Sequence, residues 1–171
     1  MRTNTFSKSC FFKALLELAE EKEYKDIQIS EICARAGYNR STFYRCYKDK
    51  EMVLMDGFKN MAAEFYASVA SESNEHNDYA KNVEILFRNI RKNKEWFLLM
   101  HHARMDYSMY EVFRENFPLP EQIEQDRKYY LDFYSGGYIA IILDWLLSGM
   151  NETDIEMGKL IAQIILITNL S

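Results

Sequence analysis

The amino-acid sequence predicts an all-α fold, with an N-terminal three-helix head that contains a helix-turn-helix and a C-terminal helical bundle. Only two prolines and six glycines occur in 171 residues, so long stretches contain no helix breaker. Apolar residues recur along the chain at the i, i+3, i+4, i+7 spacing of one helix face. No segment shows the apolar–polar alternation that is typical of a half-buried strand.

The first predicted helix covers residues 7–23 and is amphipathic. Phe11, Leu15 and Leu18 follow the spacing of one face, and the glutamates of this segment are expected to be solvated. A short connection over residues 24–28 leads to the next helix. The apolar face of the first helix is therefore the surface on which the next two helices are expected to pack.

The second and third predicted helices are joined by a turn at Gly37. Ser30 is in position to cap the second helix, and Gly37 is expected to end it in the left-handed conformation. Ser41 or Thr42 can cap the third helix, which runs through Tyr47. Two short helices joined by a glycine-containing turn form a helix-turn-helix. The residues placed to hold this pair against the first helix are Ile29, Ile32, Cys33, Ala36, Phe43 and Tyr47.

The rest of the chain is predicted to form a bundle of longer helices. Asp49 is a fair N-cap for a fourth helix, and the polar residues 71–78 are predicted to form a loop. Pro118 and Pro120 lie in a second loop. The further helices are predicted over residues 79–91, 94–104, 107–116, 121–149 and 152–169. We predict two domains, a head over residues 1–50 and a body over residues 51–171.

The net charge of −5 conceals a basic segment near the N-terminus. Residues 1–55 carry ten Lys or Arg and eight Asp or Glu, a formal charge of +2, and the remaining residues carry −7. Between residues 35 and 50 one anion, Asp49, stands among five cations: Arg35, Arg40, Arg45, Lys48 and Lys50. Because phosphate contacts release counterions locally, the placement of cations matters more than the chain average.

The exposed face of the third helix is predicted to read DNA in the major groove. It offers Arg40, Ser41, Thr42, Tyr44 and Arg45, with no carboxylate among them. Arginine can bond guanine bidentately, threonine can contact a base edge or a thymine methyl, and hydroxyls can donate to phosphate. Lys48 and Lys50 border the fourth helix, and Ser30 can contact a phosphate besides capping. The alternative interpretation is an ordinary solvated helix face.

The segment ISEICARAGYNRSTFYRCYKDKE, residues 29–51, resembles the head of the TetR family of bacterial transcriptional regulators. That head typically has Ala-Gly, then Thr-Phe-Tyr, then Lys-Glu at the spacing found here, and the resemblance covers about the first 55 residues. It implies that Thr42 and Tyr44 contact DNA and that Lys50 meets a phosphate. The positions that would choose bases are those of Arg40, Ser41 and Arg45.

Three positions depart from the pattern of that family. Tyr38 and Asn39 stand where Val-Ser is usual, and Cys46 replaces a histidine that often assists at the DNA backbone. The body is similar to the ligand-binding and dimerisation region of the family, particularly in FYSGGYIAIILDWLLSG, residues 133–149. Residues 1–50 are therefore expected to form the DNA-binding domain and residues 51–171 the ligand-binding and dimerisation domain.

Two surfaces of the body are predicted from this resemblance and from the aromatic and apolar patterns. An apolar or aromatic effector is expected against Trp96, Met100, His101, Tyr107, Tyr110 and Phe113. A homodimer interface is expected at Tyr134, Gly137, Ile141, Trp145, Ile161 and Ile165. The alternative for both sets is that these residues belong to the core of a monomer.

The sequence gives no reason to predict an enzyme, a metal site or a cofactor. The acids are scattered and the histidines His101 and His102 are adjacent, so they point about 100° apart on a helix and cannot readily share one metal ion. Cys10, Cys33 and Cys46 form no CxxC pair, which favours reduced thiols in the cytoplasm. No signal peptide is expected, and the most apolar run, residues 139–147, is too short to span a membrane.

The predicted function is sequence-specific DNA binding by a homodimeric transcriptional regulator, a repressor that a small-molecule effector releases from its operator. Two alternatives from other classes remain open. One is a helical enzyme or small-molecule-binding protein in which the head serves only as a scaffold. The other is an adaptor that has the fold but does not regulate transcription.

Overall fold

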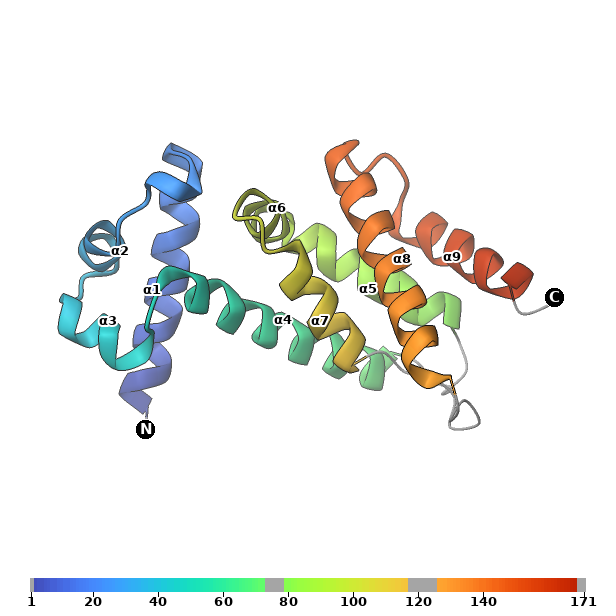
Figure 1. The fold of residues 1–171 in the computed structure, drawn as a ribbon, viewed down its shortest axis with the longest axis horizontal. Helices are drawn as coiled ribbons and strands as arrows, with labels where there is room; N and C mark the ends of the chain where they lie inside the picture. The colour runs from blue at the N-terminus through green and yellow to red at the C-terminus, as the bar shows by residue number, and fades with distance from the viewer. Residues whose placement is uncertain (1, 73–78, 117–125, 169–171) are drawn as a thin grey trace. The chain divides into compact units, whose positions relative to one another are not determined.

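The computed structural model describes residues 2–72, 79–116 and 126–168, and every regular element in them is helical. The elements are α1 (Arg2–Glu21), η1 (Tyr24–Asp26), α2 (Ile29–Ala36), α3 (Arg40–Cys46), α4 (Lys50–Glu72), α5 (Tyr79–Lys92), α6 (Lys94–His102), α7 (Asp106–Asn116), α8 (Arg127–Leu147) and α9 (Asp154–Thr168) (Figure 1). The all-α prediction is therefore confirmed.

Most helix boundaries lie within a few residues of their predicted positions. The starts of two helices depart most, because α1 begins at Arg2 and not at Ser7, and α8 begins at Arg127 and not at residue 121. Residues 71 and 72, predicted in a loop, are the last turn of α4. The remaining loop residues 73–78, the loop with both prolines, and residues 121–125 of the predicted long helix lie outside the described residues.

The chain divides into two compact units. Unit 1 contains residues 1–78 and 95–103, and unit 2 contains residues 79–94 and 104–171. Packing thus places α4 and α6 with the head. The boundary predicted at residue 50 divides a DNA-binding domain from a ligand-binding and dimerisation domain, and this functional division stays a prediction.

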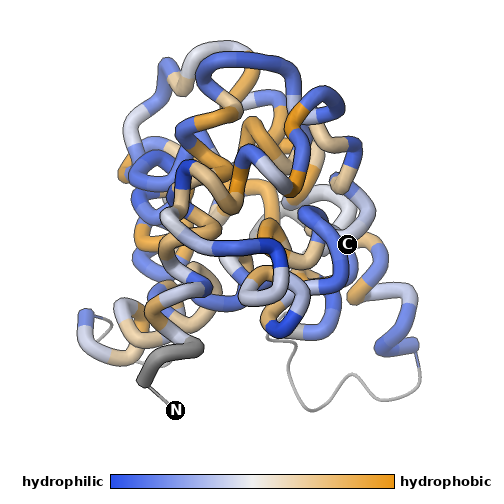
Figure 2. The backbone as a smooth tube through the Cα atoms, turned by 90° about the vertical axis from the view of Figure 1, so that its left-hand side faces the viewer, coloured by the Kyte–Doolittle hydropathy of each residue, from blue (hydrophilic) through white to orange (hydrophobic). Residues whose placement is uncertain are grey.

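Phe11 of α1 is the centre of the head in unit 1. Its fully buried ring lies 5.2 Å from the ring of Phe43 and 6.3 Å from that of Tyr47. The ring of Tyr38, in the turn, lies 5.3 Å away. Hydrophobic and hydrophilic residues alternate along the helices, as Figure 2 shows. One aromatic cluster therefore holds α1 and α3 together.

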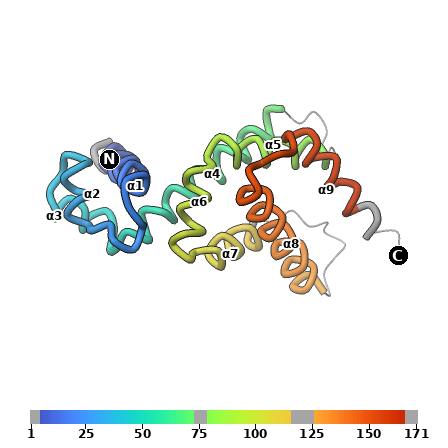
Figure 3. Tube along the Cα trace, turned by 90° about the horizontal axis from the view of Figure 1, so that it is seen from above, coloured from blue at the N-terminus to red at the C-terminus, as the bar shows by residue number. Residues whose placement is uncertain are grey.

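Unit 2 is organised around α5, which lies beside α9 (Figure 3). The two helices approach closely at Gly158, where an added Cβ would lie 2.6 Å from the carbonyl oxygen of Ala80. On α8, the ring of Trp145 meets the ring of Phe87 edge to face at 5.0 Å. A close backbone contact and an aromatic contact therefore fix α9 and α8 on α5. Among the described residues, no helix combines the length and the apolar character that a membrane span requires.

Candidate nucleic-acid interface

The turn between α2 and α3 has the predicted left-handed glycine. Gly37 has φ 74° and ψ 28°, a conformation that costs side-chain-bearing residues more than glycine. The N–H of Tyr38 donates to the carbonyl of Cys33 at 2.9 Å, which closes the end of α2. The chain therefore turns sharply enough to begin α3 at Arg40.

The cap of α2 corrects the prediction for Ser30. The helix begins at Ile29, so the N-cap is Gln28, and the N–H of Gln28 donates to Oε2 of Glu31 at 2.9 Å. Glu31 also bonds Lys22, which directly follows α1, and both contacts lower the pKa of its carboxyl, the Lys22 contact more strongly. Ser30 lies exposed in the first turn of α2, where it is free of the capping role.

The cap of α3 also differs from the predicted one. Asn39, not Ser41 or Thr42, precedes the helix, and its Oδ1 accepts the backbone N–H of Thr42 at 2.9 Å. The same oxygen accepts the hydroxyl hydrogens of Ser41 at 2.8 Å and Thr42 at 2.9 Å. Asn39 is the residue of this site that the sequence reasoning missed. Its signal was available, because asparagine three residues before a threonine is a favoured N-cap.

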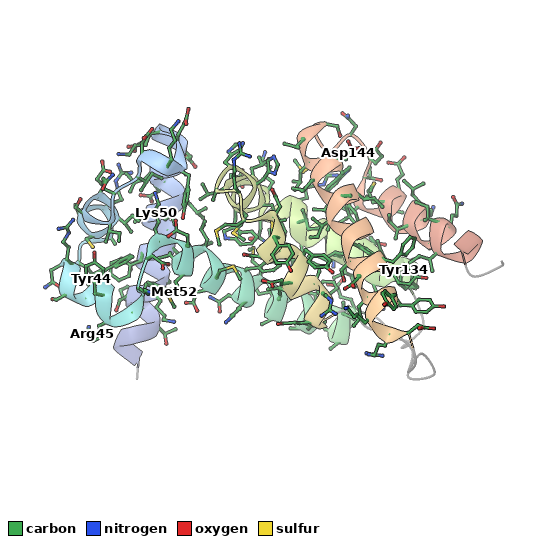
Figure 4. All side chains as sticks on the ribbon, in the orientation of Figure 1. Tyr44, Arg45, Lys50, Met52, Tyr134 and Asp144 are labelled. Atoms are coloured by element: carbon green, nitrogen blue, oxygen red, sulfur yellow. The ribbon has the colours of Figure 1, made fainter. Side chains whose placement is uncertain are left out.

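Three of the predicted cations project from the head and have no partner among the described residues. Arg40 and Arg45 on α3 and Lys48 after it are exposed, and none has an ion pair or side-chain hydrogen bond in the described part of the chain. Tyr44 is 55% exposed on the same helix. Figure 4 shows Tyr44 and Arg45 on α3. The outer face of α3 thus combines cations and hydroxyls without a carboxylate.

The other two predicted cations are engaged by the protein. Arg35 pairs with Glu21 at 2.8 Å and Glu17 at 3.6 Å, which ties α2 to α1. The ammonium of Lys50 donates to the carbonyls of Tyr24 at 2.7 Å and Ile27 at 2.9 Å. The structure therefore gives Lys50 protein acceptors where the family resemblance implies a phosphate.

The start of α4 is anchored at two points. Oδ1 of Asp49 accepts the N–H of Met52 at 2.9 Å, which confirms the predicted cap. The hydroxyl of Tyr47 donates to Oδ2 of Asp56 at 2.8 Å, and burial raises the pKa of that tyrosine. Met52 itself is 46% exposed at the beginning of α4 (Figure 4), an apolar side chain that the sequence reasoning did not single out.

The predicted effector residues Trp96, Met100 and His101 all lie on α6 in unit 1. Trp96 and Met100 are buried, and the indole of Trp96 stacks on the ring of Phe58 at 5.1 Å. The Trp96 N–H has no hydrogen-bond partner in the described residues. His101 is partly exposed.

The other three predicted effector residues lie on α7 in unit 2. Tyr107 is 69% exposed. The hydroxyl of Tyr110 donates to Asp132 of α8 at 2.8 Å, and the ring of Phe113 stacks on that of Tyr138 at 6.4 Å. The six residues are therefore divided between the two units, and a common pocket stays a prediction.

Two residues predicted at a dimer interface belong instead to the core of unit 2. Trp145 is 3% exposed, lies under the guanidinium of Arg91 at 4.7 Å, and donates its N–H to the carbonyl of Glu152. Ile161 is 2% exposed. An apolar stripe has the same spacing whether it faces its own core or a partner, so the sequence pattern alone does not separate these two places, and the dimer interface stays a prediction.

The outward face of α8 lies on the side of the helix opposite the buried Trp145. Of the predicted residues, Gly137 is exposed, whereas Tyr134, Ile141 and Ile165 are partly exposed. The exposed residues between 129 and 147 are Tyr129, Tyr130, Phe133, Gly137, Ala140, Asp144 and Leu147. Only Asp144 among them is charged, and Figure 4 shows it near the end of α8.

Comparisons with known proteins agree with this arrangement. Residues 11–55 match the family model described as bacterial regulatory proteins, tetR family. Residues 77–166, more than half of the chain, match the model described as transcriptional regulator C-terminal region. The uncharacterized HTH-type transcriptional regulator YxbF of Bacillus subtilis (strain 168) is 29% identical over 140 residues, which are 77% of this chain and 37% of that protein. The chain thus spans little more than a third of that relative.

Two solved structures share the fold. The dihydroxyacetone kinase operon activator DhaS superposes with a TM-score of 0.62, at 16% identity and 95% coverage of both chains. A TetR transcriptional regulator from Streptococcus agalactiae 2603V gives a TM-score of 0.56, at 19% identity and 96% coverage of both chains. Two family models, one for the head and one for the body, and a helix-turn-helix with the spacing of the family place this protein in the TetR family of bacterial transcriptional regulators, whose members are not enzymes.

Proposed function

We propose that this protein binds a specific DNA operator by laying α3 in the major groove. The observation that carries the proposal is the outer face of α3, where Arg40, Tyr44 and Arg45 are exposed beside no carboxylate. Arginine side chains of this kind pair bidentately with guanine, the commonest specific contact in the major groove. Base choice is assigned to Arg40 and Arg45, together with Ser41 and Thr42.

Positioning on the DNA backbone is assigned to residues at the edges of this face. Lys48 follows α3 and has no protein partner in the described residues, so its charge is available to a phosphate. Ser30, in the first turn of α2, presents an exposed hydroxyl. Such contacts fix the register of the protein on the duplex without reading its sequence.

The protein is proposed to act as a homodimer that uses the outward face of α8. Phe133 is 67% and Leu147 55% exposed there, and an apolar helix face of this length is unusual in contact with water. A two-fold dimer would present two copies of α3 to half-sites about 34–36 Å apart. The expected operator is therefore close to a palindrome.

Regulation by an effector is proposed for the body. Two of the three buried side-chain polar atoms without hydrogen-bond partners in the described residues, Trp96 Nε1 and Ser135 Oγ, support a small, mostly apolar or aromatic ligand that satisfies one of them. We assign the protein the role of a repressor in the cytoplasm. Because the structural relative DhaS is named an operon activator, the assay must be able to report activation of transcription as well as repression.

The test is selection of bound sequences from random duplex DNA. The affinity for the most enriched sequence is then measured by fluorescence anisotropy titration. Arg45→Ala is expected to cost about 1–3 kcal/mol and to relax base preference at one position of each half-site. Arg127→Ala, an exposed arginine at the start of α8, is the matched control and should change neither quantity. Failure of the wild-type protein to enrich any sequence would refute the proposal. A promoter–reporter fusion then gives the sign of regulation.

A further inference from the structure

The side chain of Lys50 is directed into the protein. Its ammonium has three N–H donors and finds three carbonyl oxygens, those of Tyr24 at 2.7 Å, Ile27 at 2.9 Å and Lys25 at 3.4 Å. The same ammonium lies 4.3 Å from the centroid of the Tyr24 ring. We call this arrangement the Lys50 tie.

The carbonyls in the Lys50 tie belong to the connection between α1 and α2. They come from the single turn η1 and from Ile27, which directly precedes Gln28, the N-cap of α2. The Tyr24 carbonyl also accepts the N–H of Ile27 at 3.2 Å, which closes the turn, and a cation placed at the carbonyl end of such a turn is favourable. One side chain from α4 therefore holds the segment that determines where α2 begins.

The neighbouring residue strengthens this connection. The hydroxyl of Tyr24, which is 8% exposed, donates to Oε1 of Glu51 at 3.1 Å. Residues 50 and 51 of α4 thus contact the ring, the carbonyl and the hydroxyl of one buried tyrosine. Desolvation lowers the pKa of Lys50, which agrees with an ammonium held against protein.

We propose that Lys50 is a positioning residue for DNA binding, which fixes the start of α2 relative to α4 and does not bind a phosphate. It acts through α2 and the turn at Gly37, which together set the place of α3. This inference rests on the proposed role of α3 in DNA binding. The proposal gives Lys50 and Glu51 a role within the protein, whereas the family resemblance implies that Lys50 contacts a phosphate.

Salt dependence distinguishes a positioning residue from a phosphate ligand. Each phosphate contact contributes about 0.9 to the slope of log affinity against log salt concentration, whereas a residue that only holds the fold contributes nothing. The experiment measures operator affinity by anisotropy over a range of salt concentrations for the full chain and for Lys50→Met, Lys50→Arg and Lys48→Ala.

Lys50→Met keeps the apolar stem and removes the donors. It is expected to weaken operator binding by about ten-fold or more at every salt concentration with an unchanged slope, because the connection before α2 loses the ammonium that donates to its carbonyls. Lys48→Ala, the comparison variant, should reduce the slope by about 0.9. Wild-type affinity for Lys50→Met, or a slope reduced as in Lys48→Ala, would overturn the proposal.

Lys50→Arg covers the case in which the methionine variant does not fold. Arginine keeps the charge, but its planar guanidinium does not match three converging carbonyls. Weaker binding with an unchanged slope supports the tie, and undiminished affinity overturns it. If the wild-type chain selects no DNA sequence, the proposed function itself fails, and that result is distinct from either outcome.

Discussion

At the scale of single residues, Asn39 controls the chemistry of the proposed reading face. Its Oδ1 accepts the hydroxyl hydrogens of both Ser41 and Thr42 as well as the N–H of Thr42. A hydroxyl has one hydrogen, so each of these two presents lone pairs to a partner outside the protein. In the major groove, the amino groups of adenine and cytosine are the base atoms that donate to such acceptors.

Asn39→Ala is therefore expected to change which sequences are bound. It removes the cap, with a loss of about 1 kcal/mol of helix stability, and releases both hydroxyls to donate or accept. Selection from random DNA should show relaxed preference at the positions that Ser41 and Thr42 contact. Asn39→Asp is the control, since a carboxylate keeps the cap and the acceptor. It should bind more weakly but with the wild-type preference, and the same relaxation in both variants would contradict the prediction.

At the scale of helices, α2 depends on an ionised carboxylate at its start. Glu31 is bonded by Lys22 and by the N–H of Gln28, and both contacts lower the pKa of its carboxyl. A carboxyl whose pKa is lower in the folded state stabilises that state above its unfolded pKa, and the contribution is lost as the pH falls through the folded pKa.

Glu31→Gln should accordingly lower the melting temperature at neutral pH and make little difference in acid, well below about pH 4.5. Thermal unfolding followed by circular dichroism at several pH values measures the difference between the two proteins. Glu20, an exposed acid on α1, supplies the matched control as Glu20→Gln. A gap between Glu31→Gln and wild type that stays constant as the pH falls would show that the carboxylate charge is not involved.

The contact between α5 and α9 depends on the absence of a side chain at Gly158. An alanine there would place its Cβ 2.6 Å from the backbone oxygen of Ala80, so the helices must separate. Gly158→Ala is expected to destabilise unit 2 by about 1–3 kcal/mol in urea unfolding. Gly136→Ala in α8 has nothing within 4 Å and should instead stabilise by about 0.5–1 kcal/mol. Equal effects of the two changes would mean that α9 does not pack this closely.

At the scale of the whole molecule, the outward face of α8 is the surface proposed to pair two chains. Phe133→Glu or Leu147→Glu places a charge among apolar neighbours, which a buried interface does not tolerate. We expect monomers in sedimentation equilibrium and a loss of operator binding, since one α3 reaches one half-site. Tyr107→Glu, on an equally exposed aromatic of α7, is the control and should stay dimeric. Dimers of both α8 variants would exclude this face.

Features that arise from local spacing can be read directly from the order of the residues. Helical periodicity gave the all-α fold, the left-handed turn followed from Gly37, and the cap of α4 followed from Asp49. The basic face of α3 was also readable, because residues three or four apart on a helix share a face whatever surrounds them.

Packing between helices settles which side chains have partners and which helix faces are covered. Arg35 and Lys50 lie in the same basic segment as Arg45, yet glutamates on α1 and carbonyls of η1 engage them. Trp145 and Phe133 are both apolar residues of α8, and only one is buried in unit 2. These outcomes depend on contacts between segments far apart in the sequence, which no periodicity within one helix records.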